Sequence, residues 1–122
     1  MSLCFEFMHK GSLDQMFRKM YNDETGAPAI TLGHAVEMAL DVARGMAYLH
    51  GRKPLPVIHR DLKPGNLMLT RAGRVKIGDF GLSKTMSVRH KMPQNLDENF
   101  NMTGETGSYR YMAPEVFRHE FY

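Results

Sequence analysis

The chain has 122 residues, with 16 Lys and Arg, 13 Asp and Glu and a formal net charge of +3. This charge is too small to indicate nucleic-acid binding, and no basic run supports such a partner. The single cysteine, Cys4, excludes an internal disulfide and fits a reducing compartment. No apolar run reaches membrane-spanning length, and the first residues lack the pattern of a signal peptide. We therefore expect a cytoplasmic or nuclear protein that inserts into no membrane.

The first apolar segment, residues 3–8, is short and aromatic and predicts a strand. Lys10 and Gly11 end it. Ser12 then has Gln15 three residues later, which is the pattern of a capping box. A short helix is therefore expected from Ser12 to about Met20.

A second, longer helix is expected after a loop at residues 21–30, which is rich in Asn, Asp, Gly and Pro. Thr31 can cap the helix, and Gly51 stands where its C-terminal stop is expected. Apolar residues recur at helical spacing between these ends, so we expect this stripe to face the core. The stripe consists of Leu32, Val36, Ala39, Leu40, Ala43, Met46, Ala47 and Leu49.

Two short strands are expected at residues 67–70 and 75–78, after a stiff connector at residues 52–56 that holds two prolines. Gly73 can take the positive φ of the turn between the strands. This hairpin places Asn66 just before one strand and Asp79 just after the other, so both side chains can face one small volume. After Gly81 the chain is polar and irregular up to about Met102, which is usual for a functional or mobile segment.

A polar loop at residues 59–66 lies between two apolar segments. A loop held at both ends by buried segments keeps reactive groups rigid. The loop brings together an imidazole, a guanidinium, a carboxylate, an ammonium and an amide, from His59, Arg60, Asp61, Lys63 and Asn66.

Two triplets follow, Asp79-Phe80-Gly81 and Ala113-Pro114-Glu115. With the polar loop, and in this order, they resemble the catalytic half of a eukaryotic protein kinase. The resemblance covers nearly the whole chain and implies an α+β, protein kinase-like fold. Residues 1–10 would form the last small-lobe strand and the hinge. Residues 11–78 would form large-lobe helices, catalytic loop and hairpin, and residues 79–115 the activation segment. A complete domain is about twice as long, so the chain looks like a fragment of one.

The resemblance assigns four residues to phosphoryl transfer with ATP and Mg²⁺ as cofactors. Asp61 would accept the proton of the substrate hydroxyl or orient it, and Lys63 would lie along the γ-phosphate. Asn66 and Asp79 would supply oxygen ligands to Mg²⁺. Taken singly, each residue is more simply a cap, a turn residue or a surface charge, but all four stand at the family's spacing.

The resemblance also places the nucleotide. Phe5 falls at the gatekeeper position, and the backbone from Glu6 to Met8 would bind the adenine edge as the hinge. Met68 would pack beneath the adenine ring. The simpler alternatives are a core strand followed by a surface helix, and an ordinary core methionine.

Other motif residues are expected to have structural roles. His59 and Phe80, the latter followed by Gly81, would stack into a column that ties the metal-binding loop to the catalytic loop. We do not expect His59 to be a base, because Asp61 already fills that role. Glu115 is expected to pair with an Arg beyond the end of this chain.

Arg60 beside the catalytic aspartate is typical of kinases whose activation segment is ordered by a phosphate, which a guanidinium grips with two hydrogen bonds. The candidate acceptors are Thr103, Thr106 and Ser108. By resemblance, Ser108 would contact the catalytic Asp and Lys, so Thr103 or Thr106 is the better target for an upstream kinase. The alternative for each is an ordinary surface hydroxyl.

The sequence after Asp61, Lys63-Pro64, resembles the serine/threonine type of catalytic loop. Residues 104–115 and Tyr48-Leu49-His50 resemble the tyrosine-kinase-like, Raf-like group of serine/threonine kinases. The expected function is transfer of the γ-phosphate of Mg-ATP to Ser or Thr hydroxyls of protein substrates.

Parts of the family pattern are missing from this chain. It has no glycine-rich loop and no small-lobe Lys–Glu pair, and Tyr122 comes before the later large-lobe helices. One alternative is therefore an inactive fragment or a pseudokinase-like binding or scaffolding module, although its four catalytic-type residues are intact. Another is a small-molecule phosphotransferase, which the triplet Ala113-Pro114-Glu115 argues against. We expect the chain alone to bind ATP weakly or not at all, without turnover.

Overall fold

The computed structural model describes residues 4–22, 30–85 and 108–118. Two helices come first along the chain, and two antiparallel strand pairs follow them, which confirms the α+β class. The helices are α1 (Leu13–Tyr21), α2 (Leu32–His50) and α3 (Pro114–Phe117), with 3-10 turns η1 (Pro64–Asn66) and η2 (Ser108–Tyr111). The strands are β1 (Val57–Ile58), β2 (Leu67–Leu69), β3 (Val75–Ile77) and β4 (Lys84–Thr85).

Helix α1 begins as predicted with a complete capping box. The Ser12 hydroxyl accepts from the Gln15 backbone N–H at 3.3 Å, and the Gln15 side-chain oxygen accepts from the Ser12 N–H at 3.0 Å. Two backbone donors at the helix start are thereby satisfied within the motif.

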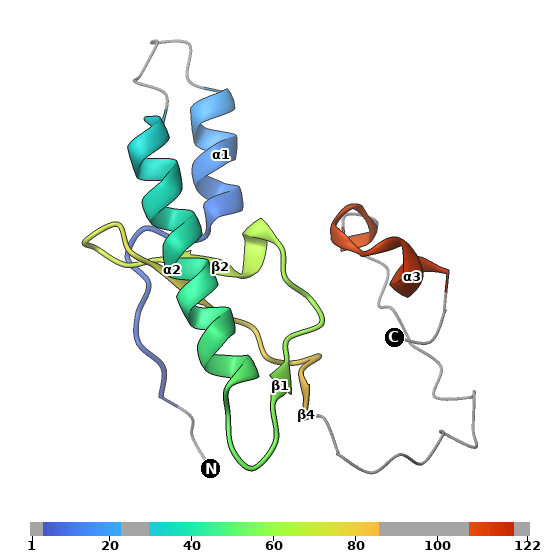
Figure 1. Cartoon of the computed structure of the whole chain (residues 1–122). Helices are drawn as coiled ribbons and strands as arrows, with labels where there is room; N and C mark the ends of the chain where they lie inside the picture. Colours follow the sequence, from blue (N-terminus) through green and yellow to red (C-terminus); the bar gives the residue numbers. More distant parts are fainter. Residues whose placement is uncertain (1–3, 23–29, 86–107, 119–122) are drawn as a thin grey trace.

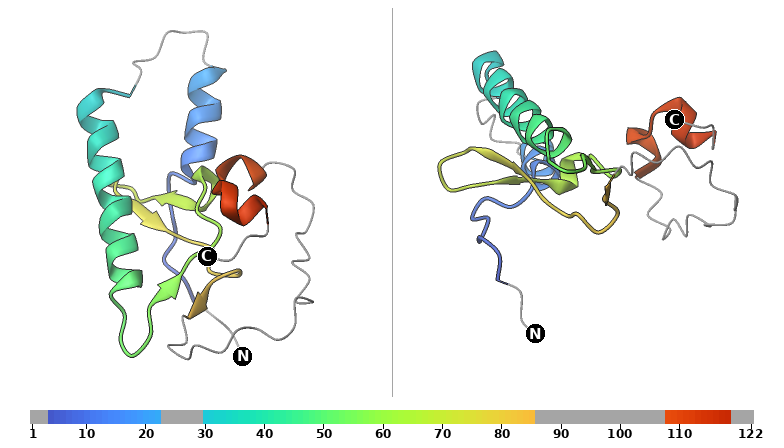
Figure 2. Two further views of the ribbon diagram at one scale, coloured as in Figure 1. Left: turned by 45° about the vertical axis from the view of Figure 1, so that its right-hand side comes forward. Right: turned by 60° about the horizontal axis from the view of Figure 1, so that its bottom comes forward.

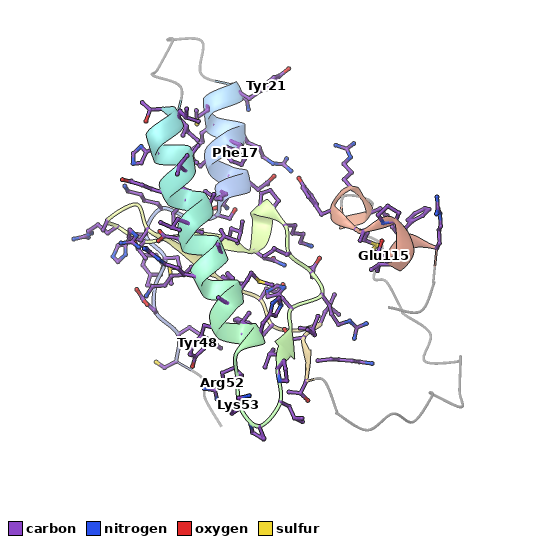
Figure 3. All side chains as sticks on the ribbon, in the orientation of Figure 1. Phe17, Tyr21, Tyr48, Arg52, Lys53 and Glu115 are labelled. Carbon is purple, nitrogen blue, oxygen red and sulfur yellow. The ribbon has the colours of Figure 1, made fainter. Side chains whose placement is uncertain are left out.

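Helix α2 also begins and ends at the expected residues. The Thr31 hydroxyl accepts from the His34 N–H at 3.2 Å, and the helix ends at His50 before Gly51. Gly51 has a φ of −83°, a value open to any residue, so it does not end the helix through the left-handed conformation. Beyond it, Arg52 donates to the Tyr48 hydroxyl at 3.1 Å and covers its ring at 5.5 Å (Figure 3).

The predicted core stripe of α2 is largely wrong. Of its eight residues only Leu49 is buried, and Leu32 is 81% exposed. The covered side of the helix instead carries Met38 and Val42, which pack against the small core of Leu13, Leu69 and Val75. Helical spacing decides which side chains share a face, but only the partners present decide which face is covered.

The hairpin of β2 and β3 forms as predicted and crosses beneath α2 (Figures 1 and 2). Leu67 pairs with Ile77 and Leu69 with Val75 in an antiparallel register. Gly73 in the connecting turn has the expected positive φ, 81°.

A second strand pair was not expected. β1 pairs with β4, with Val57 opposite Thr85 and Ile58 opposite Lys84. β4 falls in the stretch after Gly81 that was expected to be irregular. Two residues give no periodicity to detect, so only the tertiary pairing reveals this strand.

The strand predicted at the N-terminal end is not formed in residues 4–8, which adopt no regular structure. Phe5 is 85% and Phe7 75% exposed. A strand needs a neighbour to pair its backbone groups. Pairing starts only at Lys10, whose N–H donates to Leu69 O at 3.2 Å, while Leu69 N donates to Gly11 O at 2.7 Å.

Helix α1 lies beside the first part of α2 in Figure 1, and α2 then runs on past the hairpin, while α3 stands to one side. An apolar hollow of about 420 Å³ lies between α1 and α2. Its lining includes Phe17, Ile30 and Met38. Within the described ranges, no helix is long and apolar enough to cross a membrane.

Candidate active site

The polar loop folds into one hydrogen-bonded unit around the Asp61 carboxylate. The Asn66 amide nitrogen donates to Asp61 Oδ2 at 2.9 Å, and the Lys63 ammonium lies 3.0 Å from the same oxygen. The turn η1 makes this possible, because Pro64 starts it and Asn66 N donates back to Lys63 O at 2.9 Å. Three of the four predicted catalytic residues are therefore brought together.

Asn66 is buried, and its side chain has a fixed orientation. Its amide nitrogen donates to the Asp61 backbone carbonyl at 2.8 Å as well as to the Asp61 carboxylate. The nitrogen is thus committed to Asp61, which leaves the amide oxygen as the atom for a cation.

His59 links the loop to the segment that carries Asp79. It is 1% exposed, and its Nδ1 accepts from the Asp61 N–H at 3.3 Å. Nε2 therefore holds the ring proton and donates to Gly78 O at 2.9 Å. The Phe80 ring centroid lies 5.2 Å away. His59 therefore contacts the backbone of both segments and the Phe80 ring.

Two residues of the site adopt left-handed backbone conformations that favour glycine. Arg60 has φ of 70° and Asp79 has φ of 55°. Such residues persist only where their surroundings hold them, and they cluster at functional sites. The Asp79 carboxylate accepts from the Gly81 N–H at 3.2 Å, which orients it within its own turn.

The candidate metal ligands come from the two open ends of the hairpin. Gly78 N donates to Asn66 O at 2.8 Å, so the backbone beside Asp79 directly contacts the backbone of Asn66. One amide oxygen and one carboxylate suit Mg²⁺, which takes few protein ligands and completes its shell with water and phosphate oxygens. In the part of the chain that the structure describes, no group of three or more His, Cys, Asp or Glu gathers as a metal site.

The predicted hinge contacts the hairpin. The Glu6 carboxylate forms an ion pair with the Lys76 ammonium of β3. Met8 O accepts from Gly11 N at 3.2 Å, and Met68 is half-buried, opposite Lys76. The gatekeeper candidate Phe5 is exposed.

Thr103 and Thr106 lie outside the described residues, as does the side chain of Ser108. Glu115 is exposed on α3, as Figure 3 shows.

The sequence analysis missed a contact between α2 and the hairpin. Asp41 of α2 accepts from Arg74 Nε at 2.8 Å and from Val75 N at 3.0 Å, and Arg74 Nη2 contacts its other oxygen. A methyl group on Gly45 would come within 2.8 Å of Ile77 Cδ1. The available signal was Gly45 itself, since a glycine inside a helix usually has a packing reason.

The bond from Arg74 is the main reason why the pKa of Asp41 falls from its usual 3.8 to about 2. The Val75 N–H and the charges of Arg74 and Arg44 act in the same direction, while burial opposes them. Asp41 in turn raises the pKa of the Arg74 guanidinium. Asp41 and Arg74 are therefore both charged throughout the physiological pH range.

Several known proteins are similar in sequence to this chain. A chain segment of serine/threonine-protein kinase VIK from Arabidopsis thaliana is 50% identical over 122 residues, covering 98% of this chain and 25% of that protein. Serine/threonine-protein kinase 12 from the same plant is 38% identical, covering 100% of this chain and 23% of its own length. Mitogen-activated protein kinase kinase kinase 7 of Drosophila melanogaster is 41% identical over 94% of this chain and 15% of that protein.

The chain thus spans about a quarter or less of these relatives. The family model for the protein kinase domain matches residues 1–122, so every described element lies within the match. This chain belongs to the protein kinase domain family.

Proposed function

We propose that the chain supplies the catalytic loop and metal-binding segment of a serine/threonine protein kinase that uses Mg-ATP. The observation that carries this proposal is the Asp61 carboxylate, held at one oxygen by Asn66 at 2.9 Å and Lys63 at 3.0 Å. Membership of the protein kinase domain family supports it, as does similarity to two serine/threonine-protein kinases of Arabidopsis thaliana.

In this proposal Asp61 binds the substrate hydroxyl and takes its proton as the hydroxyl oxygen bonds to the γ-phosphorus and the bond to the leaving ADP breaks. Lys63 lies beside that carboxylate and offsets negative charge that develops on the transferred phosphoryl group. Asn66 holds Asp61 in place through its amide nitrogen, so the base does not need to reorganise during transfer.

Asn66 and Asp79 would hold Mg²⁺, which neutralises the ATP phosphates when bound. The backbone of residues 6–8 would bind the adenine edge and Met68 would cover one face of the ring. Arg60 would grip a phosphate placed on Thr103 or Thr106 by an upstream kinase. Lys63-Pro64 favours Ser or Thr as the acceptor on protein substrates.

The proposal is tested in a complete kinase domain that contains this chain, by assaying γ-phosphate transfer to mixed peptides. Asp61→Asn should lower the rate by about 10²-fold or more, because a positioned base contributes about that much. ATP binding should be nearly unchanged, because Asp61 contacts the acceptor.

The labelled peptides should contain phosphoserine or phosphothreonine. Dominant phosphotyrosine would refute the acceptor class. Full activity in the Asp61→Asn protein would refute the role of Asp61. Nucleotide binding without any transfer by the unaltered domain would favour a pseudokinase-like binding module instead.

A further inference from the structure

We propose that Asp41 and Gly45, one turn apart on α2, together fix the place of strand β3 and thereby position Asp79 for metal binding. They are positioning residues, since neither is argued to touch the metal. The inference rests on the proposed function, in which Asp79 is a metal ligand.

The first point of contact is at the start of β3. Asp41 Oδ2 accepts from Val75 N at 3.0 Å and from Arg74 Nε at 2.8 Å, so one carboxylate oxygen holds two successive residues. The Asp41 side chain is only 7% exposed, whereas the Arg74 side chain is 61% exposed, so the carboxylate is covered and its partner reaches it from the surface.

The second point of contact is at the end of β3. A Cβ on Gly45 would lie 2.8 Å from Ile77 Cδ1, closer than such atoms approach without a shift. The absence of a side chain at Gly45 therefore lets Ile77 lie directly against the helix. A larger residue must displace at least the end of the Ile77 side chain, and a branched residue such as Val demands more room than a single methyl group.

The two contacts match in spacing. Asp41 and Gly45 are four residues apart, so they share a helix face and differ by about 6 Å along the axis. Val75 and Ile77 are two residues apart, on one face of a strand, and differ by about 6.6 Å. Because the spacings agree, sliding β3 along α2 would lose both contacts.

Two hydrogen bonds link the end of β3 to the residues of the candidate metal site. Gly78 follows Ile77 and donates from its N–H to Asn66 O at 2.8 Å. Its carbonyl accepts from His59 at 2.9 Å. Asp79 is the next residue, in a left-handed conformation that leaves little freedom to correct a shift of β3.

The test measures metal binding directly, in a complete kinase domain that contains this chain. Mn²⁺ is titrated with a non-hydrolysable ATP analogue present, and free Mn²⁺ is followed by electron paramagnetic resonance. Asp41→Asn and Gly45→Val should each weaken Mn²⁺ binding by about tenfold, the scale of residues that orient metal ligands. Binding of the analogue without metal should not change.

Asp14→Asn is the matched control. It breaks a carboxylate–arginine contact of similar length, 2.7 Å to Arg18, on α1 and away from β3. Its Mn²⁺ affinity should equal that of the unaltered domain. If Asp41→Asn does not fold, Arg74→Lys keeps the charge but loses the forked geometry, and should weaken binding by about threefold.

Equal Mn²⁺ affinity in the unaltered domain and in the folded variants would overturn the positioning role and leave the proposed function standing. A variant that loses thermal stability but keeps its Mn²⁺ affinity would also overturn the positioning role. Metal binding without phosphate transfer by the unaltered domain would overturn the proposed function alone. No Mn²⁺ binding by the unaltered domain would overturn the inference itself.

Discussion

At the scale of single residues, His59 shows how one side chain can hold two segments of the chain together. It is almost fully buried, and both ring nitrogens are used, one accepting from Asp61 N and one donating to Gly78 O. Removing such a group takes away these partners of two partly buried backbone atoms, which lowers stability.

We expect His59→Phe to lower the free energy of unfolding of a complete kinase domain by about 1–3 kcal/mol, since the ring is kept and the two bonds are lost. Denaturant unfolding measures this. His9→Phe is the control, because His9 is exposed and its ring centroid lies 4.9 Å from that of the Phe7 ring. Equal stability of the two variants would contradict the linking role of His59.

Asp41 gives a prediction of pH dependence. Its pKa is about 2 in the folded protein against the usual 3.8, so folding favours the charged form. The stability it contributes is fully present above about pH 4 and is lost as the pH falls toward 2. The charged groups that face it are Arg74 and Arg44, and Glu37 also acts on Arg74.

Asp41→Asn should therefore destabilise a complete domain at pH 7, and its difference from the unaltered domain should shrink between pH 4 and pH 2. Unfolding curves across this range measure it. A difference that stays constant down to pH 2 would show that the charge of Asp41 does not contribute.

At the scale of elements, the capping box of α1 tests whether a local motif contributes to stability. Ser12→Ala removes the acceptor of the Gln15 N–H and should destabilise α1 by about 1 kcal/mol, the usual effect of losing a cap. Ser12→Thr keeps a hydroxyl and should have little effect. Hydrogen exchange of the α1 amides measures both. Equal exchange in the alanine and threonine variants would contradict the cap.

At the scale of the whole molecule, little apolar surface is buried among the residues that the structure describes. One cluster joins Leu13, Leu69 and Val75 with four half-buried neighbours, and Leu49 is buried apart from it. Large apolar side chains remain exposed on α2 and near the N-terminal end, including Leu32 at 81% and Phe5 at 85%. Uncovered apolar surface forgoes about 25 cal/mol per Å², and a domain holds roughly 5–15 kcal/mol in reserve.

We therefore expect the 122-residue chain by itself to melt without a sharp transition and to aggregate. Mg-ATP should not raise its melting temperature, and it should not transfer phosphate to a generic basic protein. Thermal melts with and without Mg-ATP, together with a transfer assay, measure this. A sharp melt raised by Mg-ATP, with measurable turnover, would show that fewer segments suffice for the site.

The sequence by itself determined the local parts of this protein. The caps at Ser12 and Thr31 and the turn at Gly73 depend on residues close in the chain, so their patterns predicted them correctly. The grouping of Asp61, Lys63 and Asn66 has the same origin, because a single short loop holds all three.

Only the tertiary structure decided the features that need a distant partner. Strand formation failed in residues 4–8 and appeared at Lys84–Thr85, because backbone pairing, and not apolar character, makes a strand. The exposed stripe of α2 and the contact of Asp41 with the hairpin arise in the same way. The position of a residue along a helix or strand determines the direction of its side chain. Burial and pairing depend on which other segments pack against that element.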